Sequence, residues 1–152
     1  HIVEDLGKLY TDVRLIAHNM AAHEFHAMGL TDSIESLFIK LNLIEKAKFF
    51  FENKLENGDV IDYNLEYQLY CMVLELSTNI LKHSNAQKAT LSLKKFEGNI
   101  ILSMSDNGTN RSNKKGGIGL KGLKDRVGNF KGKMIIRSEE GFEVYIEIPQ
   151  LV

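Results

Sequence analysis

The sequence predicts an α+β fold: an N-terminal helical hairpin, then a sandwich of helices on a mixed, mainly antiparallel sheet. Three observations lead to this prediction. Residues 1–56 hold two glycines and no proline, which suits long helices, whereas residues 106–141 hold eight glycines. Apolar residues recur at helical spacing early in the chain. They alternate with polar residues in its last segment, as in a half-buried strand.

Composition limits the class of protein. The chain has 152 residues with 43% hydrophobic and 26% charged side chains, which is a globular balance. Nineteen basic and twenty acidic side chains give a net charge of −1, so no global basic field could hold nucleic acid. The single cysteine, Cys71, excludes an intrachain disulfide. No apolar run is long enough to span a bilayer, and the chain begins with His1. We therefore expect a cytoplasmic piece of a longer protein, whose parent could be membrane-anchored.

The first 46 residues predict the hairpin. Two helical stripes are separated by Gly29, which is a plausible C′ residue, and the second helix is expected to start at Thr31-Asp32. The stripes consist of Leu6, Leu9, Val13, Ile16 and Met20, and of Ile34, Leu37, Phe38, Leu41 and Ile44. Because one hairpin cannot cover both stripes, we expect a homodimer that forms a four-helix bundle.

Residues 47–152 predict the sandwich. Asn64 is a candidate cap for the long helix, Asn57-Gly58-Asp59 a turn, and Glu97-Gly98 a hairpin turn. The expected elements are a strand at 49–51, a helix at 64–83, strands at 88–95 and 99–105, a helix at 119–129, and strands at 132–138 and 142–148. A polar, glycine-rich loop connects residues 106 and 117.

Polar side chains gather near the end of the predicted helix 64–83. Glu75, Asn79 and His83 are four residues apart and lie along one side of that helix, and Lys82 lies beside them. Oxygen ligands of this kind suit Mg²⁺, which keeps phosphates and waters in its shell. A solvated helix face is the alternative reading of the same residues.

A carboxylate follows the next predicted strand. Asp106 at a strand end could accept a hydrogen bond from an exocyclic amine of the kind that adenine carries. Gly108 would let backbone approach a flat base closely. A plain turn would use the same residue types. An EF-hand is excluded because Gly117 stands where the bidentate Glu is required.

Glycines also precede the predicted helix 119–129. Backbone N–H groups between Gly116 and Gly122, with nearby lysines, could hold phosphate at a helix start. A flexible surface loop is the alternative. Residues 117–122 also match the dinucleotide pattern G-x-G-x-x-G. That pattern should follow a strand directly, whereas here a polar loop intervenes, so an NAD-dependent oxidoreductase is a weak alternative.

One histidine in the first predicted helix is a candidate nucleophile. His23 lies roughly 60° from the centre of the apolar stripe, so it should reach solvent. Glu24 follows it and could accept an imidazole proton. A neutral imidazole can attack phosphorus. An inert surface histidine is the alternative.

In combination, these motifs resemble the transmitter core of a two-component sensor histidine kinase. The resemblance is closest to the nitrate-sensor and desaturase-sensor subgroup, which has a compact Bergerat-fold ATPase domain. Residues 74–84 are similar to its N box, and residues 117–127 are similar to its second glycine box. The resemblance implies a dimerisation and phosphotransfer hairpin at 1–46 and an ATP-binding domain at 47–152.

The resemblance also implies roles and partners. Asn79 would hold Mg²⁺, and Glu75 would shape the metal and water shell. Asp106 would read the adenine amino group, and Gly108 would admit the base. Lys82 and His83 would lie near the phosphates, and Gly117, Gly119 and Leu120 would wrap the triphosphate. His23 would accept the γ-phosphoryl group from ATP and pass it to an aspartate in the receiver domain of a response regulator.

Departures from the family pattern motivate a non-enzymatic alternative. Ala21-Ala22 stand where the family's hairpin has His-Asp, and Asn110 stands where the first glycine box continues with glycine. Only Gly141-Phe142-Glu143 remains of the usual glycine motif before the last strand. The alternative is a degenerate scaffold that binds nucleotide or dimerises without kinase activity.

Overall fold

The computed structural model describes residue 25, residues 27–109 and residues 118–150. For residues 118 and 119 it describes the backbone only. A helix covers residues 27–42. The labelled elements that follow are β1 (Lys48–Asn53), α2 (Tyr63–His83), β2 (Lys88–Phe96), β3 (Asn99–Asp106), α3 (Ile118–Asn129), β4 (Lys133–Arg137) and β5 (Phe142–Pro149). Each element predicted for residues 47–152 is present, with ends that differ by at most two residues.

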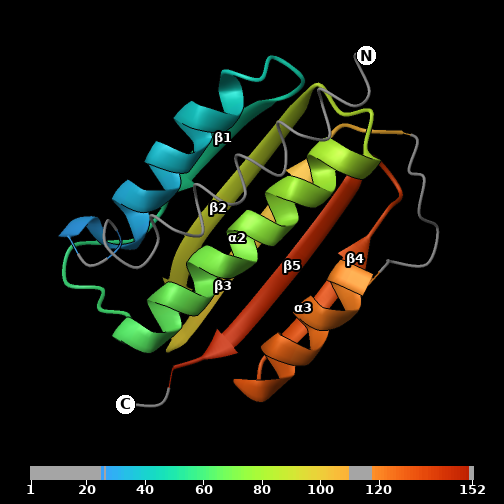
Figure 1. The fold of residues 1–152 in the computed structure, drawn as a ribbon. Coiled ribbons are helices and arrows are strands. Elements are labelled where there is room, and N and C mark those ends of the chain that lie inside the picture. The colour runs from blue at the N-terminus through green and yellow to red at the C-terminus, as the bar shows by residue number, and fades with distance from the viewer. Residues whose placement is uncertain (1–24, 26, 110–117, 151–152) are drawn as a thin grey trace.

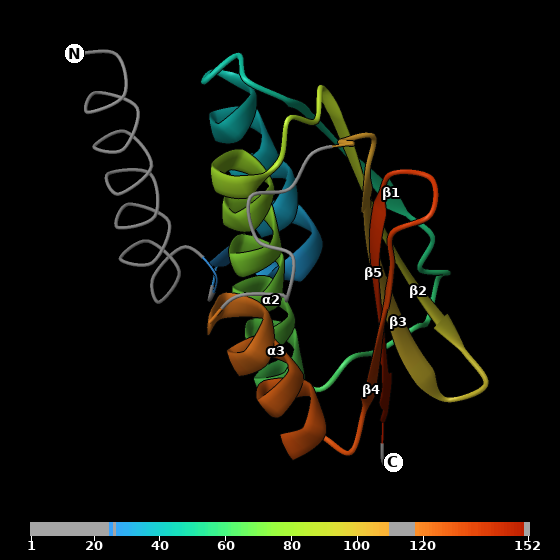
Figure 2. The same cartoon turned by 90° about the vertical axis from the view of Figure 1, so that its right-hand side faces the viewer.

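The five strands form one mixed sheet in the order β1-β2-β3-β5-β4. β1 pairs with β2 in parallel, and every other pair is antiparallel. The helix at 27–42, α2 and α3 all lie on one face of this sheet (Figures 1 and 2). The predicted α+β sandwich is therefore confirmed.

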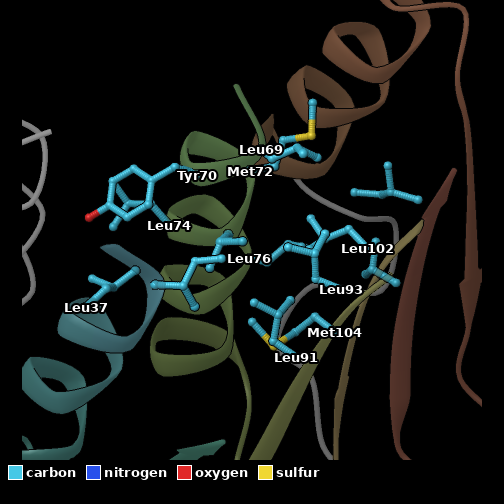
Figure 3. Close-up of a cluster of buried hydrophobic side chains, with 14 of the residues drawn as sticks. Leu37, Leu69, Tyr70, Met72, Leu74, Leu76, Leu91, Leu93, Leu102 and Met104 are labelled. Carbon is cyan, nitrogen blue, oxygen red and sulfur yellow. The ribbon is translucent and has the colours of Figure 1, made fainter. Parts of the chain in front are cut away.

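The core lies between the sheet and α2. Every second residue of a strand points to the helix side, which buries Leu91 of β2, Leu102 and Met104 of β3, and Ile146 of β5. The apolar side of α2 faces them (Figure 3). Its core residues include Leu69, Met72 and Leu76. This packing fixes α2, and hence its polar residues, against the sheet.

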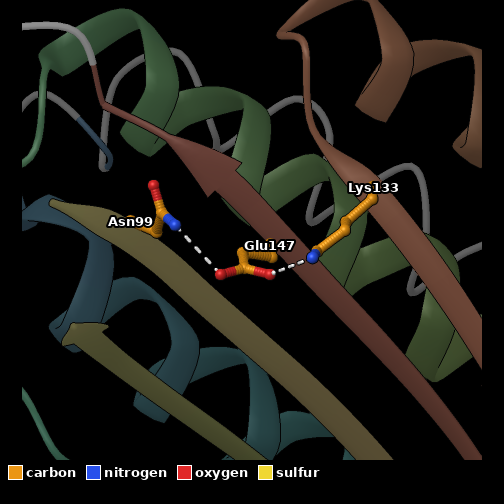
Figure 4. Close-up of polar contacts among 3 residues, drawn as sticks. All are labelled: Asn99, Lys133 and Glu147. Carbon is orange, nitrogen blue, oxygen red and sulfur yellow. Dashed lines mark hydrogen bonds and ion pairs between the residues drawn. The ribbon is translucent and has the colours of Figure 1, made fainter. Parts of the chain in front are cut away.

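The opposite face of the sheet carries polar pairs. The Glu147 carboxylate accepts a hydrogen bond from Asn99 Nδ2 at 2.9 Å and pairs with Lys133 Nζ at 3.1 Å (Figure 4). These two hydrogen bonds lower the pKa of Glu147 below its ordinary value. Glu147 thus points away from the helices, as the alternation in the last strand predicts.

The second predicted stripe of the hairpin is covered within the chain. Ile34, Leu37, Phe38 and Leu41 are all at most 4% exposed, in the same core cluster as α2 and the sheet. The ring of Phe38 lies 5.4 Å from that of Phe49 in β1. The expectation that a dimer partner covers this stripe is corrected: the sheet and α2 supply the apolar surface that the stripe needs.

The start of that helix is also held by α2. Phe25 is 1% exposed, and its ring centroid lies 5.7–5.9 Å from those of three tyrosines of α2, Tyr63, Tyr67 and Tyr70. Gly29 has φ 81°, but it lies inside the helix of residues 27–42, so the predicted helix start at Thr31-Asp32 is wrong. The first predicted helix lies outside the described residues, so the hairpin, its dimer and the division at residue 46 stay predictions.

Two local predictions concern turns and caps. Glu97 and Gly98 both have positive φ, as a tight hairpin turn between β2 and β3 requires, and Gly58 has φ 94° in its turn. The predicted cap Asn64 is wrong. The Asp62 carboxylate caps α2 by accepting hydrogen bonds from the backbone N–H groups of Asn64 and Leu65.

Candidate functional site

The polar row on α2 lies where the sequence predicts it. Glu75 and Asn79 are half-buried, whereas Lys82 and His83 are exposed in the last turn. The two basic side chains stand at the end of a helix where positive charge is favourable. Lys46 supports this end, because its ammonium group donates a hydrogen bond to the carbonyl of Leu81.

The same row faces α3. Tyr67 and Cys71 continue the row of Glu75 and Asn79 toward the start of α2, at steps of four residues. Burial raises the pKa of the Cys71 thiol, and the positive charge of Arg126 in α3 opposes that rise, which places Arg126 near Cys71. α3 runs opposite to α2 (Figure 1). Its first residues therefore lie toward the C-terminal half of α2.

Asp106 ends β3 on the helix-covered face of the sheet. It is 7% exposed, in register with the buried Ala89. Its Oδ1 accepts a hydrogen bond from Ser84 Oγ at 3.3 Å and another from the Gly108 backbone N–H at 2.8 Å. Burying a carboxylate requires such donors. Because Ser84 is the C-cap of α2, this bond joins the end of α2 to the end of β3.

Two glycines lie close to Asp106, Gly108 at its carboxylate and Gly141 at its backbone oxygen. A Cβ atom on Gly108 would lie 2.2 Å from Ser84 Oγ and 2.9 Å from Asp106 Oδ1. Gly141 has φ 83°, and a Cβ atom there would lie 2.3 Å from the backbone oxygen of Asp106. Gly108 thus lies close to atoms of the chain itself, and its predicted role in admitting a flat base stays a prediction.

Polar residues beyond the predicted set fix the loop after Asp106. Asn85 Oδ1 accepts a hydrogen bond from the Thr109 backbone N–H at 2.9 Å, and Asn85 Nδ2 donates to Thr109 Oγ1 at 3.3 Å. Asn107 Oδ1 accepts from the backbone N–H groups of Gln87 and Lys88 at 2.9 and 3.0 Å. Sequence reasoning missed Ser84, Asn85 and Gly141. The available signal for Ser84 and Asn85 was their residue type, because Ser and Asn are favoured in turns.

The structure thus gathers part of the predicted set at one end of the molecule. Three parts of the chain lie on the helix-covered face of the sheet toward this end: the C-terminal half of α2, the end of β3 and the start of α3 (Figures 1 and 2). Gly119 and the half-buried Leu120 lie in the first turn of α3. His23 and Gly117 lie outside the described residues.

The candidate metal donors on α2 are the amide oxygen of Asn79 and the carboxylate of Glu75. Within the described ranges there is no group of three or more His, Cys, Asp or Glu residues that could hold a metal ion. Such a small set of protein oxygens suits Mg²⁺, because this ion completes its coordination shell with phosphate oxygens and waters. A metal held only by protein ligands would need a larger set.

Known proteins resemble this chain in sequence and in fold. No protein-family model matches the chain. The sensor histidine kinase MctS of Rhizobium johnstonii is 25% identical over 147 residues, which cover 91% of this chain and 31% of MctS. The kinase/phosphatase DegS of Brevibacillus brevis is 26% identical over 157 residues, which cover 97% of this chain and 40% of DegS. The chain is related to the transmitter cores of sensor histidine kinases.

A solved structure agrees with this transmitter-core assignment at the level of the fold. The histidine kinase domain of a blue-light-activated histidine kinase from Erythrobacter litoralis aligns with a TM-score of 0.68 at 17% identity, covering 92% of this chain and 74% of that domain. The aligned part of the chain spans less than half the length of the curated relatives named above. Over the part of the chain that the structure describes, no helix is both long and apolar enough to cross a membrane.

Proposed function

We propose that the chain binds Mg·ATP between α2, α3 and the end of β3, and that it transfers the γ-phosphoryl group to a histidine. The receiver domain of a response regulator would then accept the phosphoryl group on an aspartate. In this proposal the chain acts as a homodimer through the predicted hairpin. Its supports are the relationship to histidine kinases and the arrangement at one end of the sheet.

The Asp106 carboxylate carries the proposal. It is buried, it accepts hydrogen bonds from Ser84 Oγ and the Gly108 backbone N–H, and it lies beside Gly108, where a side chain has no space. Burying a carboxylate at a strand end costs free energy. Recognition of a ligand N–H group is a reason for the chain to have a buried carboxylate at this position. In the proposal, it accepts a hydrogen bond from the adenine amino group, and Gly108 lets the base approach.

The remaining residues would bind the triphosphate. Asn79 would ligate Mg²⁺ through its amide oxygen, and Glu75 would orient a water beside it. Lys82 and His83 would lie near the phosphates, while Gly117, Gly119 and Leu120 would enclose them at the start of α3. The metal supplies charge neutralisation when bound, so that positioning and electrostatics provide most of the catalysis.

The proposed acceptor is His23. One imidazole nitrogen would form a bond to the γ-phosphorus while the bond between that phosphorus and the leaving oxygen of ADP breaks. The proton on the other ring nitrogen would pass to a base, for which Glu24 is the neighbouring candidate. The products are phosphohistidine and ADP.

Nucleotide binding and phosphotransfer are tested separately. Calorimetric titration with Mg·ATP should show saturable binding that Asn79→Ala weakens at least tenfold, because the amide ligand is lost. Asn99→Ala is the matched control: Asn99 is an equally half-buried amide, but it lies on the polar face of the sheet. Equal affinities of wild type and Asn79→Ala would remove Asn79 from the site.

Phosphotransfer is followed with ATP labelled at the γ-phosphate. Label on the chain that is acid-labile and base-stable, and that disappears in His23→Gln, would establish histidine phosphorylation at the proposed residue. Variants of His18 and His26 are the controls. Tight Mg·ATP binding without label on any histidine would refute the kinase and leave a nucleotide-binding scaffold.

A further inference from the structure

We propose that Ser84 is a positioning residue that orients the Asp106 carboxylate and thereby sets selectivity for a base with an exocyclic amino group. The inference rests on the proposed function and deepens it by naming the group that fixes base selectivity. Ser84 follows the basic end of α2 and belongs to neither glycine loop.

The geometry gives the Ser84 hydroxyl a defined direction. Its oxygen accepts a hydrogen bond from the Ala86 backbone N–H at 3.0 Å and donates its proton to Asp106 Oδ1 at 3.3 Å. Ser84 and Asp106 are 6% and 7% exposed, so water competes little for either bond. A hydroxyl that accepts from one fixed donor has fewer rotamers open to it and holds its acceptor in one orientation.

The second donor to Asp106 depends on the same hydroxyl. Gly108 N donates to Oδ1 at 2.8 Å, and a Cβ atom on Gly108 would lie 2.2 Å from Ser84 Oγ. Ser84 and the Gly108 backbone therefore both hold Oδ1, and a side chain at residue 108 has no space. Removal of the hydroxyl takes one of these two donors from Oδ1 and loosens the orientation of the carboxylate.

The consequence of that rotation is specific to the base. An amino group at position 6 of a purine donates to a carboxylate, whereas an oxo group there is an acceptor and repels it. A site built around a buried acceptor discriminates strongly against a ligand that lacks the matching donor. The orientation of Asp106 should therefore affect the ratio of ATP to ITP affinity, since these nucleotides differ at this position of the base.

The experiment measures that ratio for Ser84→Ala, Ser84→Thr and Ser77→Ala. Ser77 is the matched control, because it lies on α2 with 0% exposure and its hydroxyl has no hydrogen-bond partner among the described residues. We expect Ser84→Ala to lower the ATP:ITP affinity ratio about tenfold, the effect of one hydrogen bond to a charged group. Ser77→Ala should leave the ratio unchanged. Ser84→Thr should keep it, because it retains the hydroxyl on the extended backbone that residue 84 adopts.

A double-mutant cycle distinguishes positioning from a general loss of structure. In an Asp106→Asn background, Ser84→Ala should change the ratio no further, because the group it orients is no longer a carboxylate. Parallel loss of ATP and ITP affinity in Ser84→Ala, with the ratio preserved, would overturn the positioning role while leaving the proposed function standing. Wild-type protein that binds neither nucleotide would instead refute the proposed function itself. Should Ser84→Ala not fold, a Ser84→Thr variant that folds and loses the ratio would also overturn the inference.

Discussion

The backbone oxygen of Asp106 lies 2.3 Å from the place where a Cβ atom on Gly141 would stand. Thirty-five residues separate the two in the sequence, and the pairing of β3 with β5 brings them together. Gly141 also has φ 83°, a conformation that side chains disfavour. The glycine before the last strand thus packs against the backbone of Asp106, the residue whose carboxylate is proposed to read the base.

Substitution of this glycine tests that contact. Gly141→Ala should destabilise the chain through backbone strain and through the clash with Asp106. Gly58→Ala is the control, because Gly58 has φ 94° but no atom within 4 Å of the added Cβ, so it should cost only the strain, about 1–2 kcal/mol. We expect Gly141→Ala to exceed that loss by about 1–3 kcal/mol in urea unfolding. Equal losses for the two variants would show that the two backbones can separate at little cost.

A second prediction concerns the packing of the helix at 27–42. Phe38→Ala should lower the unfolding free energy by about 3–5 kcal/mol, because it leaves a cavity against Phe49 and the sheet. Leu43→Ala, at a position that is 77% exposed, is the control and should change little. If residues 27–42 belong to one cooperative unit with the sheet, unfolding of residues 25–150 stays a single transition by circular dichroism and by tyrosine fluorescence. Loss of helical signal ahead of the tyrosine signal would instead support a separate hairpin domain.

A third prediction is a pH dependence on the polar face. Hydrogen bonds from Lys133 and Asn99 lower the pKa of Glu147 in the folded chain (Figure 4). Folding therefore favours the charged carboxylate. Its contribution is complete above the ordinary glutamate pKa and is lost as the pH falls through the lowered pKa of the folded state. Glu147→Gln should lower Tm at pH 7, and its Tm should approach that of wild type in strong acid.

The control for this effect is Glu139→Gln. Glu139 is an exposed carboxylate between β4 and β5. Thermal unfolding from pH 7 down to pH 3 measures both variants. A Tm difference for Glu147→Gln that persists undiminished at pH 3 would contradict an electrostatic origin.

A fourth prediction concerns α3. Gly122 lies inside this helix with no atom within 4 Å of an added Cβ. Gly122→Ala should therefore stabilise the chain by about 0.5–1 kcal/mol, because alanine loses less backbone entropy in a helix. Gly128→Ala, also in open space but in the last turn, should gain less. Denaturant unfolding compares the two. A loss of stability at Gly122 would mean that this position needs glycine for a reason other than space.

The sequence by itself determined the elements from β1 to β5, because periods of 2 and 3.6 are local properties of the chain. It also located the polar row of Glu75 and Asn79 and the strand end at Asp106. Periodicity states which face is apolar but not what covers that face. Only the tertiary structure decided that the stripe of Phe38 packs on the sheet of its own chain. It also decided the contacts of Ser84 and Gly141 with Asp106, because these join residues 22 and 35 positions apart and depend on the pairing of whole strands.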